Sequence, residues 1–464
     1  MWVKLHILTI LFVLIFHLIM PGTALSAIHR LKPGEKITPV LDQAADGDTI
    51  RLAEGEYFEN LVIETRVLLT GKGAHIRGGY EGHTILVTAG GVIIRNIQVS
   101  ESGERLIEDM ACIRIEADSV EIDNCLITRP LHGIYVKGGS YANLHNNRIE
   151  GRPDLNESDR GNGIHLWNSK HNSLIENKIS GTRDGIYFSF ADSTDITSNI
   201  ISQVRYGLHY MYSNVNKFSE NIFEENVAGA ALMYSKEIYF YRNVFARCRG
   251  FRAYGILYQS MDNSVAEGNL VIDNSRGLYF FNSDRNVFFG NDIVDNDLAI
   301  QINGSCEENR IFQNNFMGNL SNVLVDNDRS KTEWTNEGQG NYWSDYEGYD
   351  LDGDGIGDIP HKVQNVFQVI ETKIPEIRLF LLSPAAKILE TAERSLPILG
   401  LGSEKDPFPV FRNIPNEKTP WAEIDKIQYT SSRISSLLYL IGSFAPMLIL
   451  LYMSRRKQSG KRGL

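Results

Sequence analysis

Two consecutive stretches of 22 residues decide how this chain folds. Residues 185–206 read GIYFSFADSTDITSNIISQVRY, and residues 207–228 read GLHYMYSNVNKFSENIFEENVA. Each opens with a glycine, continues with alternating apolar and polar residues, and carries an asparagine 14 positions after the glycine. Alternation with a period of two is typical of a β-strand, whose successive side chains point to opposite faces. The stretch therefore predicts a short strand after each glycine and a turn at each asparagine.

The same unit recurs along much of the chain. Each opening glycine from Gly133 to Gly277 is followed 14 positions later by an asparagine, and the eighth coil, opened by Ala299, has Gln313 there. The asparagines are Asn147, Asn177, Asn199, Asn221, Asn243, Asn269 and Asn291. A repeat of this length indicates a solenoid, and a helical repeat conflicts with the period of two. We predict an all-β right-handed parallel β-helix, with these asparagines stacked as a ladder in left-handed backbone conformation at one turn.

Both ends of the chain carry targeting signals. An apolar run from Leu5 to Met20 follows Lys4 and precedes small residues, which predicts a signal peptide over residues 1–26. Residues 434–453 are uncharged and long enough to span a bilayer, which predicts a C-terminal transmembrane helix. The basic residues in the tail 454–464 predict a cytoplasmic end and therefore a periplasmic β-helix anchored in the cytoplasmic membrane. These residues are Arg455, Arg456, Lys457, Lys461 and Arg462.

Between these ends we predict three regions. Residues 27–339 form the β-helix with an N-terminal cap, residues 340–401 form an acidic, aromatic loop and a helical region, and residues 402–433 form a polar tether. The formal net charge of −11 disfavours nucleic acid as a partner. The cysteines lack metal-finger spacing, so disulfides and buried hydrophobic roles both stay open. They are Cys112, Cys125, Cys248 and Cys306.

The outward residues of the glycine-led strands form two columns, two and four positions after each opening residue. His209 and Met211 are neighbours on one strand, and Met233 lies one coil beyond Met211, so an imidazole and two thioethers share one face. These ligands suit Cu(I), with His165, two coils away, in a supporting role. Insertions near Gly151 and Gly250 would wall this face on both sides. The alternative is a surface for a partner protein that includes Trp167 and Tyr187.

An acidic stretch near residue 350 resembles the first part of a calcium loop. Asp350, Asp352, Asp354 and Asp358 occupy positions 1, 3, 5 and 9, and the Ile356 carbonyl occupies position 7. The expected glutamate at position 12 is replaced by His361. We therefore expect either a structural Ca²⁺ site or a tight acidic turn without metal.

Catalytic carboxylates are missing from the two outward columns. Neither column contains an Asp or Glu in the eight regular coils, and Arg183 and Asp184 precede a strand without a stacked partner. This pattern disfavours hydrolases and lyases, which need convergent carboxylates, and predicts a protein that is not an enzyme. The alternative is an envelope protein that binds or cleaves polysaccharide. Its aromatic platform would consist of Tyr135, Trp167, Tyr187 and Tyr279.

The segment after the coils supports a family resemblance. Residues 340–346 read GNYWSDY and residues 350–360 read DLDGDGIGDIP, with LSPA at 382–385 and DPFP at 406–409. Together with the asparagine-bearing coils, these segments resemble the NosD family of exported maturation proteins for nitrous oxide reductase, also called periplasmic copper-binding proteins.

This resemblance implies a role in denitrification as an accessory protein without enzymatic activity of its own. The implied partners are an ABC transporter permease and its ATPase, a copper-donating lipoprotein and apo nitrous oxide reductase. The implied cargo is Cu(I). No family motif fixes the copper ligands, so His209, Met211 and Met233 rest on the column pattern alone.

Overall fold

The computed structural model describes residues 26–326, 331–364, 366–374 and 404–421, with isolated positions between 377 and 392. The predicted signal peptide, transmembrane helix and basic tail lie outside the described residues. Among the described residues, no helix is long and apolar enough to cross a membrane. The described residues up to Thr419 belong to one compact unit.

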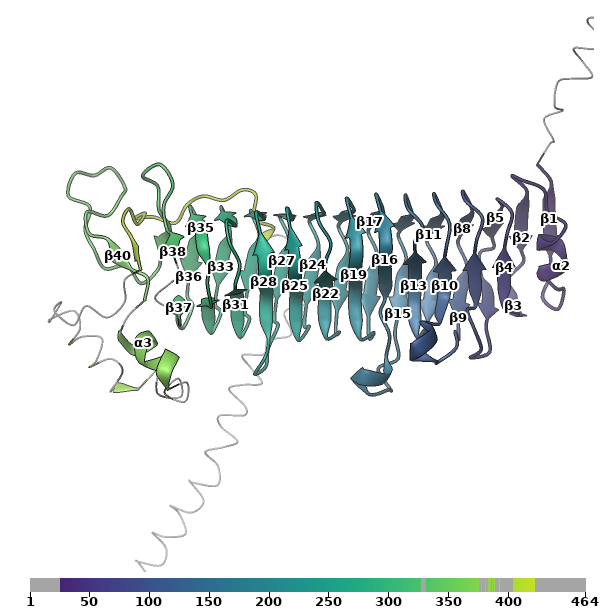
Figure 1. Cartoon of the computed structure of the whole chain (residues 1–464), viewed down its shortest axis with the longest axis horizontal. Helices are drawn as coiled ribbons and strands as arrows, with labels where there is room; N and C mark the ends of the chain where they lie inside the picture. Colours follow the sequence, from purple (N-terminus) through teal and green to yellow (C-terminus); the bar gives the residue numbers. More distant parts are fainter. Residues whose placement is uncertain are drawn as a thin grey trace, which may run out of the picture. The chain divides into compact units, whose positions relative to one another are not determined.

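Three parallel sheets wind into a right-handed solenoid of stacked coils, which confirms the predicted all-β fold (Figure 1). Sheet A contains β1 (Ile28–Leu31), β2 (Thr49–Leu52), β5 (Leu68–Thr70), β8 (Ile93–Arg95), β11 (Glu121–Asp123), β14 (Asn143–His145), β17 (Ser173–Ile175), β20 (Asp195–Thr197), β23 (Lys217–Ser219), β26 (Tyr239–Tyr241), β29 (Val265–Glu267), β32 (Val287–Phe289), β35 (Glu307–Phe312) and β38 (Lys331–Glu333).

Sheets B and C complete the walls of each coil. Sheet B contains β3 (Gly55–Phe58), β6 (Ala74–Arg77), β9 (Gln98–Ser100), β12 (Leu126–Thr128), β15 (Arg148–Glu150), β18 (Lys178–Ser180), β21 (Ile200–Ser202), β24 (Ile222–Glu224), β27 (Val244–Ala246), β30 (Leu270–Ile272), β33 (Asp292–Val294), β36 (Asn315–Met317) and β39 (Tyr342–Trp343). Sheet C contains β4 (Leu61–Ile63), β7 (Ile85–Val87), β10 (Ala111–Ile115), β13 (His132–Lys137), β16 (Ile164–Lys170), β19 (Asp184–Asp192), β22 (Tyr206–Met211), β25 (Ala228–Lys236), β28 (Tyr254–Asp262), β31 (Arg276–Phe281), β34 (Leu298–Asn303) and β37 (Val323–Val325).

The described helices are short. They are α2 (Thr38–Leu41) in the first coil, the 3-10 turns η1 (Leu106–Glu108) and η2 (Glu157–Asp159), and α3 (Val366–Lys373) after the last coils. The strands β40 (His361–Lys362) and β41 (Lys405–Asp406) form a small antiparallel pair. Helices therefore contribute little to the walls of the solenoid.

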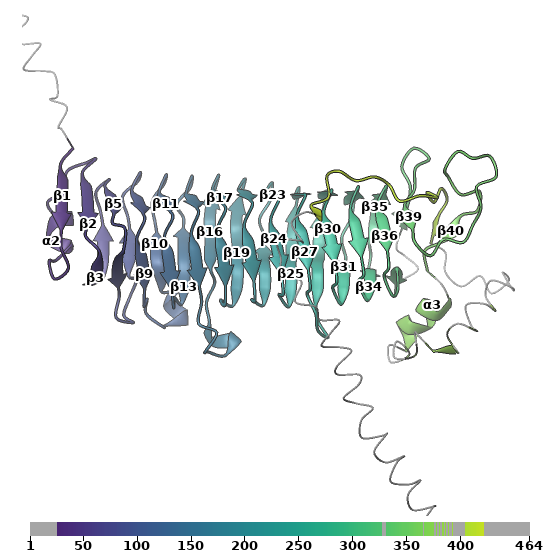
Figure 2. The same cartoon turned by 180° about the vertical axis from the view of Figure 1, so that it is seen from behind.

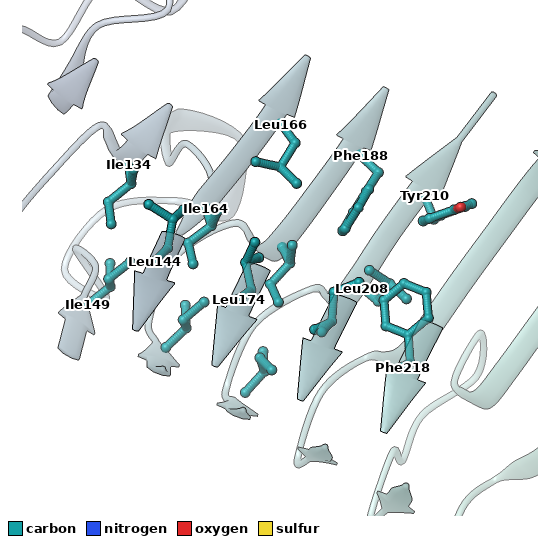
Figure 3. Packing of buried hydrophobic residues seen from close by; sticks show 14 of the residues in the cluster. Ile134, Leu144, Ile149, Ile164, Leu166, Leu174, Phe188, Leu208, Tyr210 and Phe218 are labelled. Carbon is teal, nitrogen blue, oxygen red and sulfur yellow. The ribbon is translucent and has the colours of Figure 1, made fainter. Parts of the chain in front are cut away.

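The interior is filled by columns of apolar side chains, one residue from each coil. Strand pairing places Ile164 beside Ile186 and Ile186 beside Leu208, as the period of two predicts. Figure 3 shows the side chains of Ile164 and Leu208 pointing inward, together with those of Phe188, Tyr210 and Phe218. Coil-to-coil ring stacking, with Phe218 and Phe240 centroids 4.8 Å apart, extends the packing along the axis. Each coil therefore buries its apolar face against its neighbours.

The predicted asparagine ladder is confirmed, but the left-handed backbone position lies one residue before each asparagine. Asn199 Nδ2 donates to Asn221 Oδ1, and Asn221 Nδ2 donates to Asn243 Oδ1, both at 2.9 Å. The left-handed position belongs to the preceding residue, such as Glu220 with φ 57°. The prediction of left-handed asparagines was therefore wrong. In the eighth coil, which is one residue longer, the ladder passes through Asn314 rather than Gln313.

The ladder ends in the segment that carries the family resemblance. Asn314 Nδ2 donates to Asn341 Oδ1 at 3.0 Å. The backbone N–H of Asn341 and Trp343 Nε1 both donate to Asp406 Oδ2, at 2.7 and 2.9 Å. Because Tyr342 and Trp343 pair with β36, the solenoid continues past the predicted boundary at residue 339. A buried carboxylate thus satisfies the last donors of the ladder.

The first part of the predicted tether instead packs on the solenoid. Residues 404–419 run back along the coils, as Figure 2 shows in yellow-green. Ile414 exchanges two hydrogen bonds of 2.9 Å with the side chain of Asn315, and Lys418 Nζ lies 2.5 Å from Glu267 Oε1. This stretch is a strap that contacts β36 of sheet B and β29 of sheet A rather than a tether, and its prolines suit an extended chain.

The four cysteines are all buried and free. Burial raises the pKa of the Cys112, Cys125 and Cys248 thiols to about 12. Of the two roles left open by the sequence, the structure supports that of small hydrophobic side chains in the coils.

Candidate metal site

The outward face of sheet C carries the predicted metal ligands. Strand pairing places Met211 on β22 directly beside Met233 on β25, and His209 precedes Met211 by two residues on the same strand. All three side chains are half-buried. The residue paired with His209 on β25 is Ala231, the smallest in its column. The structure therefore brings the imidazole and both thioethers to one patch, as the column pattern predicts.

His209 is oriented by Asp184, a carboxylate that lies outside the two predicted outward columns. His209 Nδ1 lies 2.8 Å from Asp184 Oδ2. Because an ionised carboxylate only accepts hydrogen bonds, Nδ1 carries a proton, and in the neutral imidazole Nε2 therefore keeps its lone pair. Burial alone would raise the pKa of Asp184, but hydrogen bonds from His209 and Arg205 hold that pKa below its ordinary value. In the neutral ring, Nε2 of His209 is thus free to act as a ligand, and Asp184 stays ionised.

Two other histidines near this face have the opposite tautomer. His83 Nδ1 accepts the backbone N–H of Ala111 at 3.1 Å, and His132 Nδ1 accepts that of Asn162 at 3.0 Å. A neutral imidazole whose Nδ1 accepts must carry its proton on Nε2. His132 Nε2 accordingly faces Asp109 Oδ1, 3.7 Å away. Neither Nε2 atom can coordinate a metal in this arrangement.

His165 belongs with these two histidines rather than with His209. Its Nδ1 lies 3.5 Å from Asn162 Nδ2, and the amide orientation is set by Arg183 Nη2, which donates to Asn162 Oδ1 at 3.2 Å. Its Nε2 is buried without a hydrogen-bond partner. The Tyr187 ring stands edge-on between His165 and His209, with centroid distances of 4.6 and 4.7 Å. The supporting role of His165 at a copper site stays a prediction.

Asp184 was missed because it lies in a third outward column. The two predicted outward columns give Asp184 no stacked partner, but Asp184 begins β19 and pairs with Tyr206 in the next coil. The residue immediately before each opening position forms this column, and that offset in the repeat could have revealed it. Its members are His132, Asn162, Asp184, Tyr206, Ala228, Tyr254, Arg276 and Leu298.

An exposed aromatic ladder flanks the two methionines. Phe190, Tyr212 and Tyr234 stack with centroids 5.4 and 5.2 Å apart, each with a positive φ of 53°, 49° and 54°. Bulky residues rarely adopt this conformation, and the same position in other coils carries residues such as Gly138 and Asn168. Strained and exposed aromatic side chains beside a candidate site point to a contact surface.

Inserted loops lie at one edge of sheet C. Residues 151–161 precede β16 and residues 247–253 precede β28, where the insertions were predicted. A third loop, 101–110, was not predicted; it carries Asp109 and is tied to loop 151–161 by the Arg152–Glu104 ion pair. Loops 101–110 and 151–161 project from the same edge (Figure 1). The cleft between loop walls stays a prediction.

The acidic loop near residue 350 closes on itself through backbone hydrogen bonds. Asp350, Asp352 and Asp354 place one carboxylate oxygen each within 4.8 Å of the others. Asp350 accepts the N–H groups of Gly353 and Gly355, at 2.7 and 3.0 Å. His361, at the twelfth position, stacks on Trp343 with centroids 4.8 Å apart. The hydrogen bonds account for the loop without an ion, and calcium stays a prediction.

The stability of the solenoid should fall as the pH drops from about 6.5 to about 4. Burial lowers the pKa of His83 to about 4 and also lowers that of His132. The unfolded chain binds protons at these histidines near pH ~6.5, so protons favour unfolding across this window. Urea unfolding at several pH values measures the effect. His83→Asn keeps an acceptor for Ala111 and should flatten the pH dependence; an unchanged slope would contradict this assignment.

Comparison with known proteins matches the chain to one described family. A family model described as periplasmic copper-binding protein (NosD) matches residues 145–348. Among solved structures, a family 28 exopolygalacturonase from Yersinia enterocolitica aligns at TM-score 0.45 and 10% identity, over 67% of this chain and 77% of that chain.

Two relatives cover most of the chain, and both are named probable ABC transporter binding protein NosD. The one from Pseudomonas aeruginosa is 37% identical over 394 residues, 81% of this chain and 91% of the relative. The one from Stutzerimonas stutzeri is 35% identical over 386 residues, 79% of this chain and 87% of the relative. By this identity and coverage, the chain belongs to the NosD family of periplasmic copper-binding proteins.

Proposed function

We propose that this protein is an extracytoplasmic scaffold that accepts Cu(I) and passes it on during copper-site maturation of nitrous oxide reductase. It would work with an ABC transporter, as the names of its relatives suggest. A membrane helix at residues 434–453 would hold it at the periplasmic face of the cytoplasmic membrane. The protein's own chemistry would be ion binding and release rather than catalysis.

The patch on sheet C carries this proposal. Thioether sulfur and imidazole nitrogen are ligands that suit a soft ion such as Cu(I). Metal-binding histidines usually donate their second N–H to a carboxylate or carbonyl, and His209 does so to Asp184 at 2.8 Å. Met211 and Met233 stand side by side on adjacent strands of the same face. Three ligands on one accessible face would leave a position for a ligand from a donor or acceptor protein.

The aromatic ladder beside the methionines supports a partner contact at this patch. Copper transfer between proteins needs the two metal sites to meet, so a docking surface should adjoin the ligands. Tyr212 follows Met211 and Tyr234 follows Met233 directly in the sequence, and both rings are exposed. Trp167, with 39% of its surface exposed, extends this face. The partners we propose are the copper-donating lipoprotein, apo nitrous oxide reductase, and the transporter permease with its ATPase.

Ring packing disfavours the polysaccharide alternative. Stacking on a sugar needs an open aromatic face. Tyr135 instead stacks on His165 at 4.2 Å, Tyr279 stacks on Tyr254 at 5.3 Å, and the Lys137 ammonium lies 5.6 Å from the Trp167 ring centroid. Tyr187 stands between two imidazoles. The predicted sugar platform is therefore largely occupied by the protein's own side chains.

Deletion of the gene should leave cells with exported nitrous oxide reductase that lacks copper. Copper content and activity of the purified reductase measure this outcome. Complementation with the wild-type gene should restore both, whereas a His209→Ala gene should restore neither at limiting copper. A fully loaded reductase in the deletion strain would refute the proposed function. Glycan binding by the purified protein without Cu(I) uptake would favour the alternative.

A further inference from the structure

We propose that Asp184 is the positioning residue of this metal site, because it fixes His209 in the tautomer whose Nε2 atom can bind Cu(I). This inference rests on the proposed function. It concerns a residue that does not touch the ion and acts only through His209.

The Asp184 carboxylate is held rigidly. Its side chain is completely buried, and Arg205 binds it with two hydrogen bonds, Nε to Oδ1 at 2.9 Å and Nη2 to Oδ2 at 2.7 Å. Arg183 Nε lies 3.6 Å from Oδ2. The Arg205 guanidinium in turn lies 4.4 Å from the Tyr206 ring centroid, which fixes its own position. A buried, doubly bound carboxylate of this kind has one orientation.

Neighbouring rings restrict the orientation of the His209 imidazole, so the position of its proton is the main remaining variable. Tyr187 and Tyr206 contact it edge-on, with centroid distances of 4.7 and 5.2 Å. Arg205 Nη2 is also 3.5 Å from His209 Nδ1, but the carboxylate oxygen at 2.8 Å is much closer. The rings therefore set the direction of the imidazole, and Asp184 sets the proton on Nδ1.

His83 and His132 show how the group that contacts Nδ1 decides which ring nitrogen carries the proton. His83 and His132 have a backbone N–H at Nδ1, which places their proton on Nε2. Similar imidazoles on one sheet thus differ in metal competence according to the group behind Nδ1. Without a carboxylate at residue 184, His209 would be free to adopt the tautomer that cannot bind Cu(I).

A nitrogen-15 NMR spectrum of the metal-free full chain tests the tautomer directly. We expect His209 to be protonated on Nδ1 and His83 and His132 to be protonated on Nε2, so each spectrum contains its own control. This measurement needs no copper and no substitution in the site. A proton on Nε2 of His209 in the wild-type protein would overturn the inference.

A double-mutant cycle tests the link to copper. Asp184→Asn keeps the shape but loses one acceptor and the charge, and should weaken Cu(I) binding by about 10- to 100-fold. In a His209→Ala background the same change should have no effect, because Asp184 acts only through that ring. A purely structural residue would lower the affinity in both backgrounds. Asp192→Asn, at the other end of β19, is the matched control and should leave the affinity unchanged.

The outcomes separate this inference from the proposed function. Unchanged Cu(I) affinity in Asp184→Asn, with tight binding by the wild type, would remove the role of Asp184 and leave the copper site standing. A wild-type chain that does not bind Cu(I) would overturn the proposed site and this inference with it. If Asp184→Asn does not fold, as judged by circular dichroism, the nitrogen-15 spectrum of the wild-type chain still tests whether His209 is protonated on Nδ1.

Discussion

Changing both Met211 and Met233 to leucine should weaken Cu(I) binding by more than about 100-fold while the solenoid stays folded. Loss of an outer hydrogen-bond partner typically weakens a metal site 10- to 100-fold, so removal of two of three ligands should cost more. Leucine matches methionine in volume, and both side chains are only half-buried, so the change should cost less than about 1.5 kcal/mol of stability. Competition with a Cu(I) chelator measures the affinity, and thermal unfolding checks the fold.

Two further variants make this prediction specific to the patch. His209→Ala, added to the double variant, should weaken binding further, because it removes the third ligand. Tyr279→Ala should have no effect, because Tyr279 lies three coils from His209 and stacks on Tyr254. Equal affinities of the wild type and the double variant would make the patch a docking surface with the metal elsewhere.

Replacing Asn221 with alanine should destabilise the solenoid by roughly 3–5 kcal/mol. Asn221 is fully buried and makes four side-chain hydrogen bonds of 2.9 Å, to Asn199 N and Nδ2, the Ile196 carbonyl and Asn243 Oδ1. Its loss leaves the buried backbone N–H of Asn199 without its acceptor and the Ile196 carbonyl without its side-chain donor, and each unsatisfied group costs about 1–3 kcal/mol. The free energy of unfolding in urea measures the effect.

Asn263 offers a matched control in the same solenoid. It is exposed, and its side chain makes one hydrogen bond, from Arg285 at 3.2 Å. Asn263→Gly removes that bond while keeping a residue suited to the positive φ of 51°. It should change stability by less than about 0.5 kcal/mol. Similar losses in both variants would mean that the ladder adds nothing beyond an ordinary surface hydrogen bond.

Much of the fold could be predicted because the repeat is regular. A fixed period aligns equivalent residues of successive coils, so the interior columns and the two outward columns follow by counting from the opening glycine. Counting fails where a coil changes length, which is why Asn314 replaced Gln313 in the ladder. It also fails for backbone conformation, since the left-handed residue precedes the asparagine and is as varied as Glu220 and Arg242.

Contacts between distant segments could not be predicted in this way. Asp406 reaches the end of the ladder at Asn341, and Lys418 reaches Glu267, more than a hundred residues away in the chain. No periodicity links such positions, and the polar, proline-rich composition of residues 404–419 suggested a free tether. The repeat therefore predicts the coils, whereas their end cap and strap depend on single long-range contacts.

The candidate site could be predicted only in part: the repeat gives its neighbouring residues but not their hydrogen bonds. His209, Met211 and Met233 were placed together by the repeat, and strand pairing confirms that they are neighbours. The proton position on His209 depends on Asp184, a residue 25 positions earlier in the chain, and on the direction of one carboxylate. Sequence patterns give neighbours but not the direction of hydrogen bonds, so the difference between His209 and His132 emerges only from the structure.

X-ray absorption spectroscopy of the full chain loaded with one equivalent of Cu(I) tests whether His209, Met211 and Met233 hold the ion. We expect a Cu(I) ion with two sulfur ligands and one imidazole nitrogen from this chain. The sulfur scattering should disappear in the variant with leucine at residues 211 and 233, because all four cysteines are buried in the coils. A shell of nitrogen and oxygen alone, or a sulfur shell that persists in that variant, would contradict this expectation.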